Sequence, residues 1–183
     1  MQNVLPGTTI EIAGFQKNIA ASVLNHIFSA GGVVLSQVAT MTELEPHTVQ
    51  NWVKRGFVSP PVRRQYSRRQ FARIVVINMM RQSLQIDQIV KLLSHVNFVL
   101  YDESDDTIDD ADLYNLFVNL LCLTPGVGVQ RQELERACEQ VLSDFQERVP
   151  GSKKRVSTVL VVMAYTWLSA LARQQAEQML RNL

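Results

Sequence analysis

The chain has 183 residues, 46% of them hydrophobic, and a formal net charge of +1. This length is enough for one sizeable domain or two small ones, and the hydrophobic content excludes wholesale disorder. Cys122 and Cys138 have no CxxC partner and no neighbouring histidine cluster, so the sequence offers no zinc site. The first residues lack the basic and apolar runs of a signal peptide. We therefore expect a reduced, cytoplasmic protein without a metal or other cofactor.

Helical spacing dominates the first third of the chain and predicts an all-α fold, with at most one tiny hairpin. Residues 15–30 repeat apolar side chains in steps of three and four, which predicts an amphipathic helix that ends at Gly31-Gly32. A short helix then runs from a cap at Ser36 to about Thr42. The next helix begins at Glu45-Pro46, because proline is tolerated at a first helical position, and ends at Gly56 in a left-handed conformation.

Residues 57–66 (FVSPPVRRQY) are too few and too rich in proline for a helix. We expect two brief extended arms joined at 60–62, which form a small wing carrying the next two arginines. Tyr66 is expected to anchor the wing or the core. Ser67 and Gln70 have the spacing of a capping box, which predicts the start of a long core helix. Ile86–Leu93 supplies the last helix of this unit.

The second half opens with seven acids and no base at residues 102–112. We expect a solvated linker near 100–108, followed by helices over 109–123, 131–148 and 153–183. Val156–Ala172 is uncharged over 17 residues, the lower limit for a membrane span, but it includes several hydroxyl side chains. We expect it to be a central helix covered by its neighbours or by a second subunit. The predicted divisions are an N-terminal segment (1–34), a helical unit (35–99) and a C-terminal helical domain (100–183).

The helix after Pro46 has two distinct faces. Val49, Trp52 and Val53 lie on one side, and His47, Gln50, Asn51 and Lys54 lie on the other. A helix in a DNA major groove needs this division, because one side fixes it to its domain while the other offers amides and a cation to bases and phosphates. A surface helix of any function can have such a polar side, so the neighbouring charges carry more weight.

Those charges are strongly one-sided. Seven of the 18 basic residues lie between Lys54 and Arg73, where there is no acid. Phosphate contacts by basic side chains supply most non-specific affinity for DNA. The basic residues expected to take part are Lys54, Arg55, Arg63, Arg64, Arg68 and Arg69.

The order of these elements is similar to the DNA-binding domain of the MerR superfamily, a winged helix-turn-helix. Lys54 to Pro60 (KRGFVSP) resembles its central motif, and Leu84–Leu93 resembles its closing helix. More narrowly, the chain resembles an uncharacterised Gram-positive bacterial family with a helical C-terminal region and a "PPVxxxYS" stretch. The resemblance covers about 60 residues and implies a DNA-binding transcriptional regulator. It carries DNA contact onto Thr48, Gln50, Asn51, Lys54, Arg63, Arg64, Arg68 and Arg69.

The chain also departs from the MerR pattern. A helix precedes the unit, the wing is short, and separate helices stand where those regulators have one long dimerising coiled coil. The cysteine clusters of their metal-sensing members are missing. The resemblance therefore implies DNA binding but not the promoter untwisting of those regulators.

The sequence supports other functions less well than DNA binding. The histidines and cysteines form no nucleophile or metal pattern, and Gly126-Val127-Gly128 lacks the rest of a nucleotide loop, so we expect no enzyme. A non-catalytic adaptor that reuses a helix-turn-helix to bind protein is the main alternative. We further expect a homodimer through the C-terminal helices, with double-stranded DNA as the partner and no membrane. The sequence does not identify a small-molecule effector.

Overall fold

The computed structural model describes residues 3–100, 106–124, 126, 128–147 and 149–182, which form eight helices and one two-stranded sheet. The expected all-α class is confirmed, apart from this small sheet. The helices are α1 (Ile19–Ile27), α2 (Leu35–Thr42), α3 (Pro46–Lys54), α4 (Arg68–Met80), α5 (Ile86–Leu93), α6 (Asp110–Leu123), α7 (Arg131–Val141) and α8 (Ser152–Arg181). The strands are β1 (Val33–Val34) and β2 (Gln65–Tyr66), which pair antiparallel.

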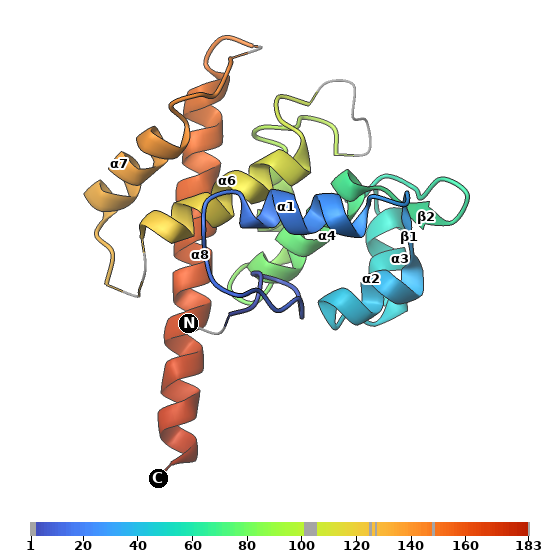
Figure 1. Ribbon diagram of the computed structural model, residues 1–183, viewed down its shortest axis with the longest axis horizontal. Coiled ribbons are helices and arrows are strands. Elements are labelled where there is room, and N and C mark those ends of the chain that lie inside the picture. The colour runs from blue at the N-terminus through green and yellow to red at the C-terminus, as the bar shows by residue number, and fades with distance from the viewer. Residues whose placement is uncertain (1–2, 101–105, 125, 127, 148, 183) are drawn as a thin grey trace.

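Helix α4 is the centre of the molecule. Eleven of its 13 residues are buried, so it is enclosed on every side rather than amphipathic. Helix α6 packs on α4, α1 packs on α6, and α8 contacts both α4 and α6 (Figure 1). Helices α2 and α3 lie at one end of this assembly, and α7 lies at the other beside α8.

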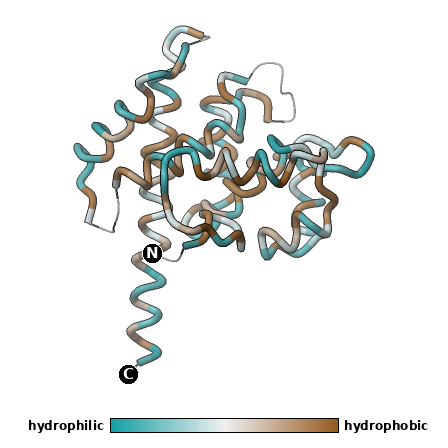
Figure 2. The backbone as a smooth tube through the Cα atoms, in the orientation of Figure 1, coloured by the Kyte–Doolittle hydropathy of each residue, from teal (hydrophilic) through white to brown (hydrophobic). Residues whose placement is uncertain are grey.

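One hydrophobic core joins the two halves of the chain. Leu24 of α1, Phe71 of α4 and Phe117 of α6 are each at most 1% exposed and belong to the same cluster. Figure 2 shows apolar residues where α4, α6 and the middle of α8 meet, and hydrophilic residues along the projecting end of α8. The core is therefore continuous across the predicted boundaries at residues 34 and 99.

Helix α8 spans 30 residues and is partly a core helix. Val156, Leu160 and Met163 are fully buried, as expected for a helix covered by its neighbours. Among the described residues it is the one helix long and apolar enough to cross a membrane, and 44% of its most apolar window is buried inside the structure. Beyond Leu171 every described residue is exposed, so the last turns extend away from the body (Figure 1).

Two helices start at positions that the sequence did not indicate. Helix α1 begins at Ile19 instead of residue 15, because Asn18 is left-handed (φ 64°) and its amide donates to Asn119 Oδ1 at 2.7 Å. Helix α2 begins at Leu35, and Ser36 is not its cap. The Gln37 side chain instead accepts a hydrogen bond from the Val34 amide at 2.9 Å.

Candidate nucleic-acid interface

Helix α3 has the two faces that its sequence predicts. Val49 and Trp52 are 0% and 5% exposed and fix the helix to α2 and the core. The side chains of the opposite face are exposed, namely those of His47, Gln50, Asn51 and Lys54. Thr48 is half-buried at the edge between the faces. After the helix, Gly56 takes the expected left-handed conformation (φ 76°).

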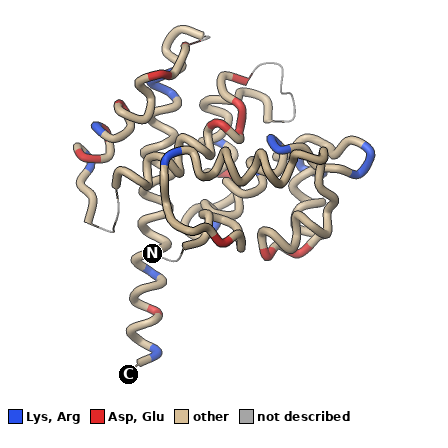
Figure 3. The backbone as a smooth tube through the Cα atoms, viewed as in Figure 1, with Lys and Arg blue, Asp and Glu red and all other residues tan. Residues whose placement is uncertain are grey.

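The wing is built differently from the prediction. Its turn lies at Arg63-Arg64 rather than at 60–62, because Val62 and Gln65 exchange both backbone hydrogen bonds, at 3.1 and 2.9 Å. Both arginines have positive φ, 51° and 64°, as the two central residues of a type I′ hairpin turn require. Their side chains are exposed at the tip of the loop, where Figure 3 shows a concentration of basic residues.

The base of the wing is held firmly. Gln70, the capping-box residue of α4, donates from Nε2 to the carbonyl oxygens of Ser59 and Pro60 at 3.0 and 2.9 Å. The β1–β2 pairing secures the other arm, and it brings Gly32 so close to β2 that a Cβ atom there would lie 2.9 Å from the Tyr66 carbonyl oxygen. Tyr66 itself is 3% exposed, so it anchors the wing to the core as expected.

Two of the predicted cations lie near the interface with partners of their own. The Arg55 guanidinium lies over the Phe57 ring, 4.4 Å from its centroid, and 3.5 Å from Asp87. Arg68 donates to Asn25 Oδ1 at 2.7 Å and is half-buried. These contacts orient the two guanidinium groups, and the Arg55 side chain remains 45% exposed to solvent.

Arg69 points into the protein instead of toward the interface. It forms an ion pair with Asp106 and lies 3.6 Å from Asp110, while Arg73, one helical turn on, bonds Asp110 Oδ1 from Nε at 2.6 Å. Burial raises the pKa of Asp110, and the charges of Arg73 and Arg69 act in the opposite direction. Arg69 is therefore not part of the candidate interface, contrary to the prediction from the sequence.

The same contacts correct the prediction of a solvated linker near 100–108. Asp106 and Asp110 do not lie in solvent, since their side chains are only 4% exposed and pair with the buried Arg73 and the largely covered Arg69. Asn97 adds a hydrogen bond to the Ile108 carbonyl at 2.9 Å, which fixes the segment to α5's end. Residues 101–105, where the other acids of the loop lie, are outside the described part of the chain.

The structure brings together most of the predicted contact residues at one end of the molecule. The exposed face of α3, Arg55 and the wing tip all belong to the end formed by α2, α3 and the sheet (Figure 1). Sequence reasoning missed the second role of Gln70 as a wing anchor and the pairing of α4 with the acids. No group of three or more potential metal ligands occurs in the part of the chain that the structure describes.

This architecture defines a helical protein with a two-helix unit and a small wing joined to a larger helical body. The chain belongs to DUF1836, a domain of unknown function whose family model matches residues 23–117. Membership in an uncharacterised family is thereby confirmed, and the match covers α2, α3, the wing and both sides of the buried ion pairs. Comparison with curated proteins and with solved structures gave no match.

Proposed function

We propose that this protein is a cytoplasmic DNA-binding transcriptional regulator in which α2 and α3 act as a MerR-like helix-turn-helix. Helix α3 enters the major groove with its exposed face, and the wing tip contacts the phosphate backbone. The single observation that carries the proposal is the combination of an outward polar face, at His47, Gln50, Asn51 and Lys54, with two exposed arginines on a rigid hairpin beside it.

The chemistry of each part suits a different task. Gln50 and Asn51 present amides, which can bond adenine through two hydrogen bonds in the major groove. Lys54, Arg63 and Arg64 present positive charges, which suit contacts to phosphate oxygens. Such contacts do not depend on the base sequence. A surface without a binding role would not need the two amides. It would also not need arginines at two positions, 63 and 64, where the backbone conformation is unfavourable for a residue with a side chain.

The proposal includes a dimer. The exposed end of α8 carries Met179 and Leu180, which are 72% and 67% exposed, and a second copy would cover them. Two recognition helices in such a dimer would address half-sites about 34 Å apart, one turn of DNA. The two cysteines, Cys122 and Cys138, are free thiols, which suits a reducing compartment.

The test begins with a fluorescent duplex of mixed sequence and the full chain, titrated by anisotropy at several salt concentrations. We expect binding at 50 mM salt that weakens steeply as salt rises, because phosphate contacts release counterions. Selection from random genomic fragments then identifies a preferred sequence. An adaptor for protein would show no salt-dependent retention of any duplex, and that result would refute the proposal.

A variant pair tests the role of α3 directly. Gln50→Ala with Asn51→Ala should weaken binding to the selected duplex by about ten- to a hundredfold, while binding to the mixed duplex changes little, because base contacts carry the discrimination. Gln132→Ala, at an exposed position of α7, is the matched control and should change neither.

A further inference from the structure

The first arm of the wing, residues 58–62, leaves the core and reaches the tip within five residues. Val58 is 1% exposed, and Val62 is 73% exposed. Between them lie Pro60-Pro61, and proline has no amide hydrogen, so these two residues cannot donate to a strand ladder. The position of the tip relative to α3 therefore depends on what binds the carbonyl groups of this arm.

One side-chain amide binds these carbonyl groups. Gln70 Nε2 donates to the carbonyl oxygens of Ser59 and Pro60 at 3.0 and 2.9 Å, and it also lies 3.0 Å from Ser59 Oγ. Gln70 Oε1 accepts from the Ser67 amide at 2.8 Å, so the side-chain amide has one orientation, with its N–H groups toward the wing. Gln70 is 6% exposed, so these bonds are largely shielded from water.

The turn of α4 that carries Gln70 is itself fixed to the body. Arg69, the preceding residue, pairs with Asp106, and Phe71, the following residue, is 0% exposed. Helix α3 is fixed to the same hydrophobic core by its buried face. Both parts of the candidate interface therefore have a common rigid support, and Gln70 joins the first arm of the wing to it.

We propose that Gln70 is the positioning residue of the candidate interface. It fixes the wing tip beside α3 before DNA is bound, so that the helix and the wing meet the duplex as one preformed surface. This inference rests on the proposed DNA binding and adds the residue that sets its geometry. Without Gln70 the wing arginines can still reach phosphates, but the loop has to be ordered during binding, which costs affinity.

The first measurement needs no DNA. Gln70→Glu keeps an oxygen that accepts from the Ser67 amide, but it removes both N–H groups and places a carboxylate against two carbonyl oxygens. NMR order parameters of the Ser59 and Val62 amides should fall from about 0.85, typical of rigid backbone, to below about 0.6. Values below about 0.6 in the unchanged chain, or no fall in the variant, would overturn the proposal.

The second measurement uses a neutral substitution, because an added negative charge near the wing would itself weaken DNA binding. Gln70→Met keeps a long side chain that favours a helix and makes none of these hydrogen bonds. Its affinity for the mixed duplex, measured by anisotropy, should fall about tenfold. The slope of log affinity against log salt concentration should stay the same, because the same phosphates are contacted once the loop is ordered.

Two results of this titration would contradict the positioning role. One is an affinity equal to that of the unchanged chain. The other is a reduction of the slope by about 1.8, which corresponds to two phosphate contacts that are lost rather than made at a greater cost.

Ser67→Ala is the matched control for the start of α4. Ser67 Oγ accepts from the Gln70 backbone amide at 3.2 Å, so this change removes a helix cap and leaves the Gln70 side chain bonded to the wing. It should lower Tm by about 2–4 °C without changing the order parameters or the DNA affinity. If it weakens DNA binding as much as Gln70→Met, a general loosening of α4 explains the effect and the proposal is wrong.

The two measurements distinguish a failure of this proposal from a failure of the regulator proposal. If the unchanged chain retains no duplex at low salt, the regulator proposal fails, and the role of Gln70 in DNA binding fails with it. The order parameters still decide whether Gln70 fixes the wing. If the duplex is retained and Gln70→Met binds it equally well, the regulator proposal stands and the positioning role fails.

Discussion

The wing tip offers a substitution that separates folding from binding. Arg63 and Arg64 both have positive φ, which costs a side-chain-bearing residue about 1–2 kcal/mol relative to a right-handed or extended conformation. Asparagine followed by glycine is the pair that this turn type prefers. The double substitution Arg63→Asn with Arg64→Gly therefore removes two exposed charges and improves the turn at the same time.

The expected effects have opposite signs. Glycine loses about 0.5–1 kcal/mol of stability through the greater freedom of the unfolded chain. The relief of backbone strain at two positions outweighs this loss. The free energy of unfolding should therefore rise by about 1 kcal/mol, which corresponds to about 2–4 °C in Tm for a domain of this size. Salt dependence is measured as the slope of log affinity against log salt concentration. The loss of two phosphate contacts should reduce the magnitude of this slope by about 1.8. If affinity at 1 M salt is unchanged, binding falls about 200-fold at 0.05 M and about 20-fold at 0.2 M.

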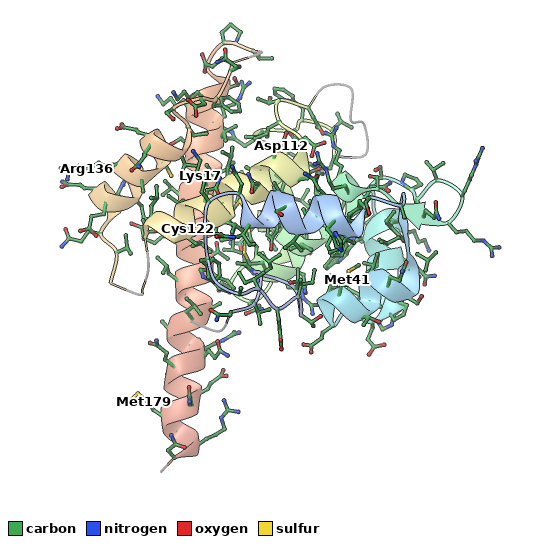
Figure 4. All side chains as sticks on the ribbon, in the orientation of Figure 1. Lys17, Met41, Asp112, Cys122, Arg136 and Met179 are labelled. Atoms are coloured by element: carbon green, nitrogen blue, oxygen red, sulfur yellow. The ribbon has the colours of Figure 1, made fainter. Side chains whose placement is uncertain are left out.

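Thermal unfolding and anisotropy titration at four salt concentrations measure both effects on one preparation. The control is Arg131→Gln with Arg136→Gln, which removes two exposed cations from α7, on the side of the molecule away from the wing (Figures 1 and 4). A double variant that is more stable but binds duplex with the original slope would refute the role of the wing. A control that loses as much affinity would show that net charge alone matters.

Three further changes test the interface and the core. Lys54→Ala should weaken all duplexes alike and lower the salt slope by about 1, without a change in Tm; a loss confined to one sequence would contradict a phosphate contact. Asp110→Asn should lower the free energy of unfolding in urea by about 3–5 kcal/mol, since it leaves Arg73 buried beside a neutral amide; a loss below 1 kcal/mol would show that the pair is dispensable. Burial raises the pKa of Cys138 to about 11 and also raises that of Cys122, so at pH 7.5 a maleimide should label Cys122 slowly and Cys138 only after unfolding, as mass spectrometry can check; prompt double labelling would contradict this packing.

Elements set by local interactions were predictable from the sequence. Helix α3 begins at Pro46 and is followed by a left-handed Gly56, and Ser67 and Gln70 cap α4, because each signal acts within four residues. The division of α3 into a buried and an exposed face follows from its spacing in the same way. These features include most of the candidate interface.

Features that depend on distant contacts were not predictable in this way. Asn119 lies 101 positions beyond Asn18, yet its side chain decides where α1 begins. The arm of the wing that follows the turn pairs with β1, a contact that no pattern within 57–66 contains. The one long-range signal available was charge, since a basic segment without acids and an acidic segment without bases occur in the same chain. Opposite runs of this kind favour pairing in the core as readily as separate solvated surfaces.

Four arginines of the basic segment consequently form two pairs with different physical roles. Arg69 and Arg73 are neutralised by buried acids and hold α4 against α6, so their charge serves the fold. Arg63 and Arg64 have the opposite situation, with exposed charges and left-handed backbone that a smaller residue would tolerate better. Because folding gains nothing from arginine at that turn, stability does not account for the choice of residue there. The proposed contact with DNA would supply that reason, and on this proposal the stability and the DNA affinity of the Asn-Gly variant should move in opposite directions.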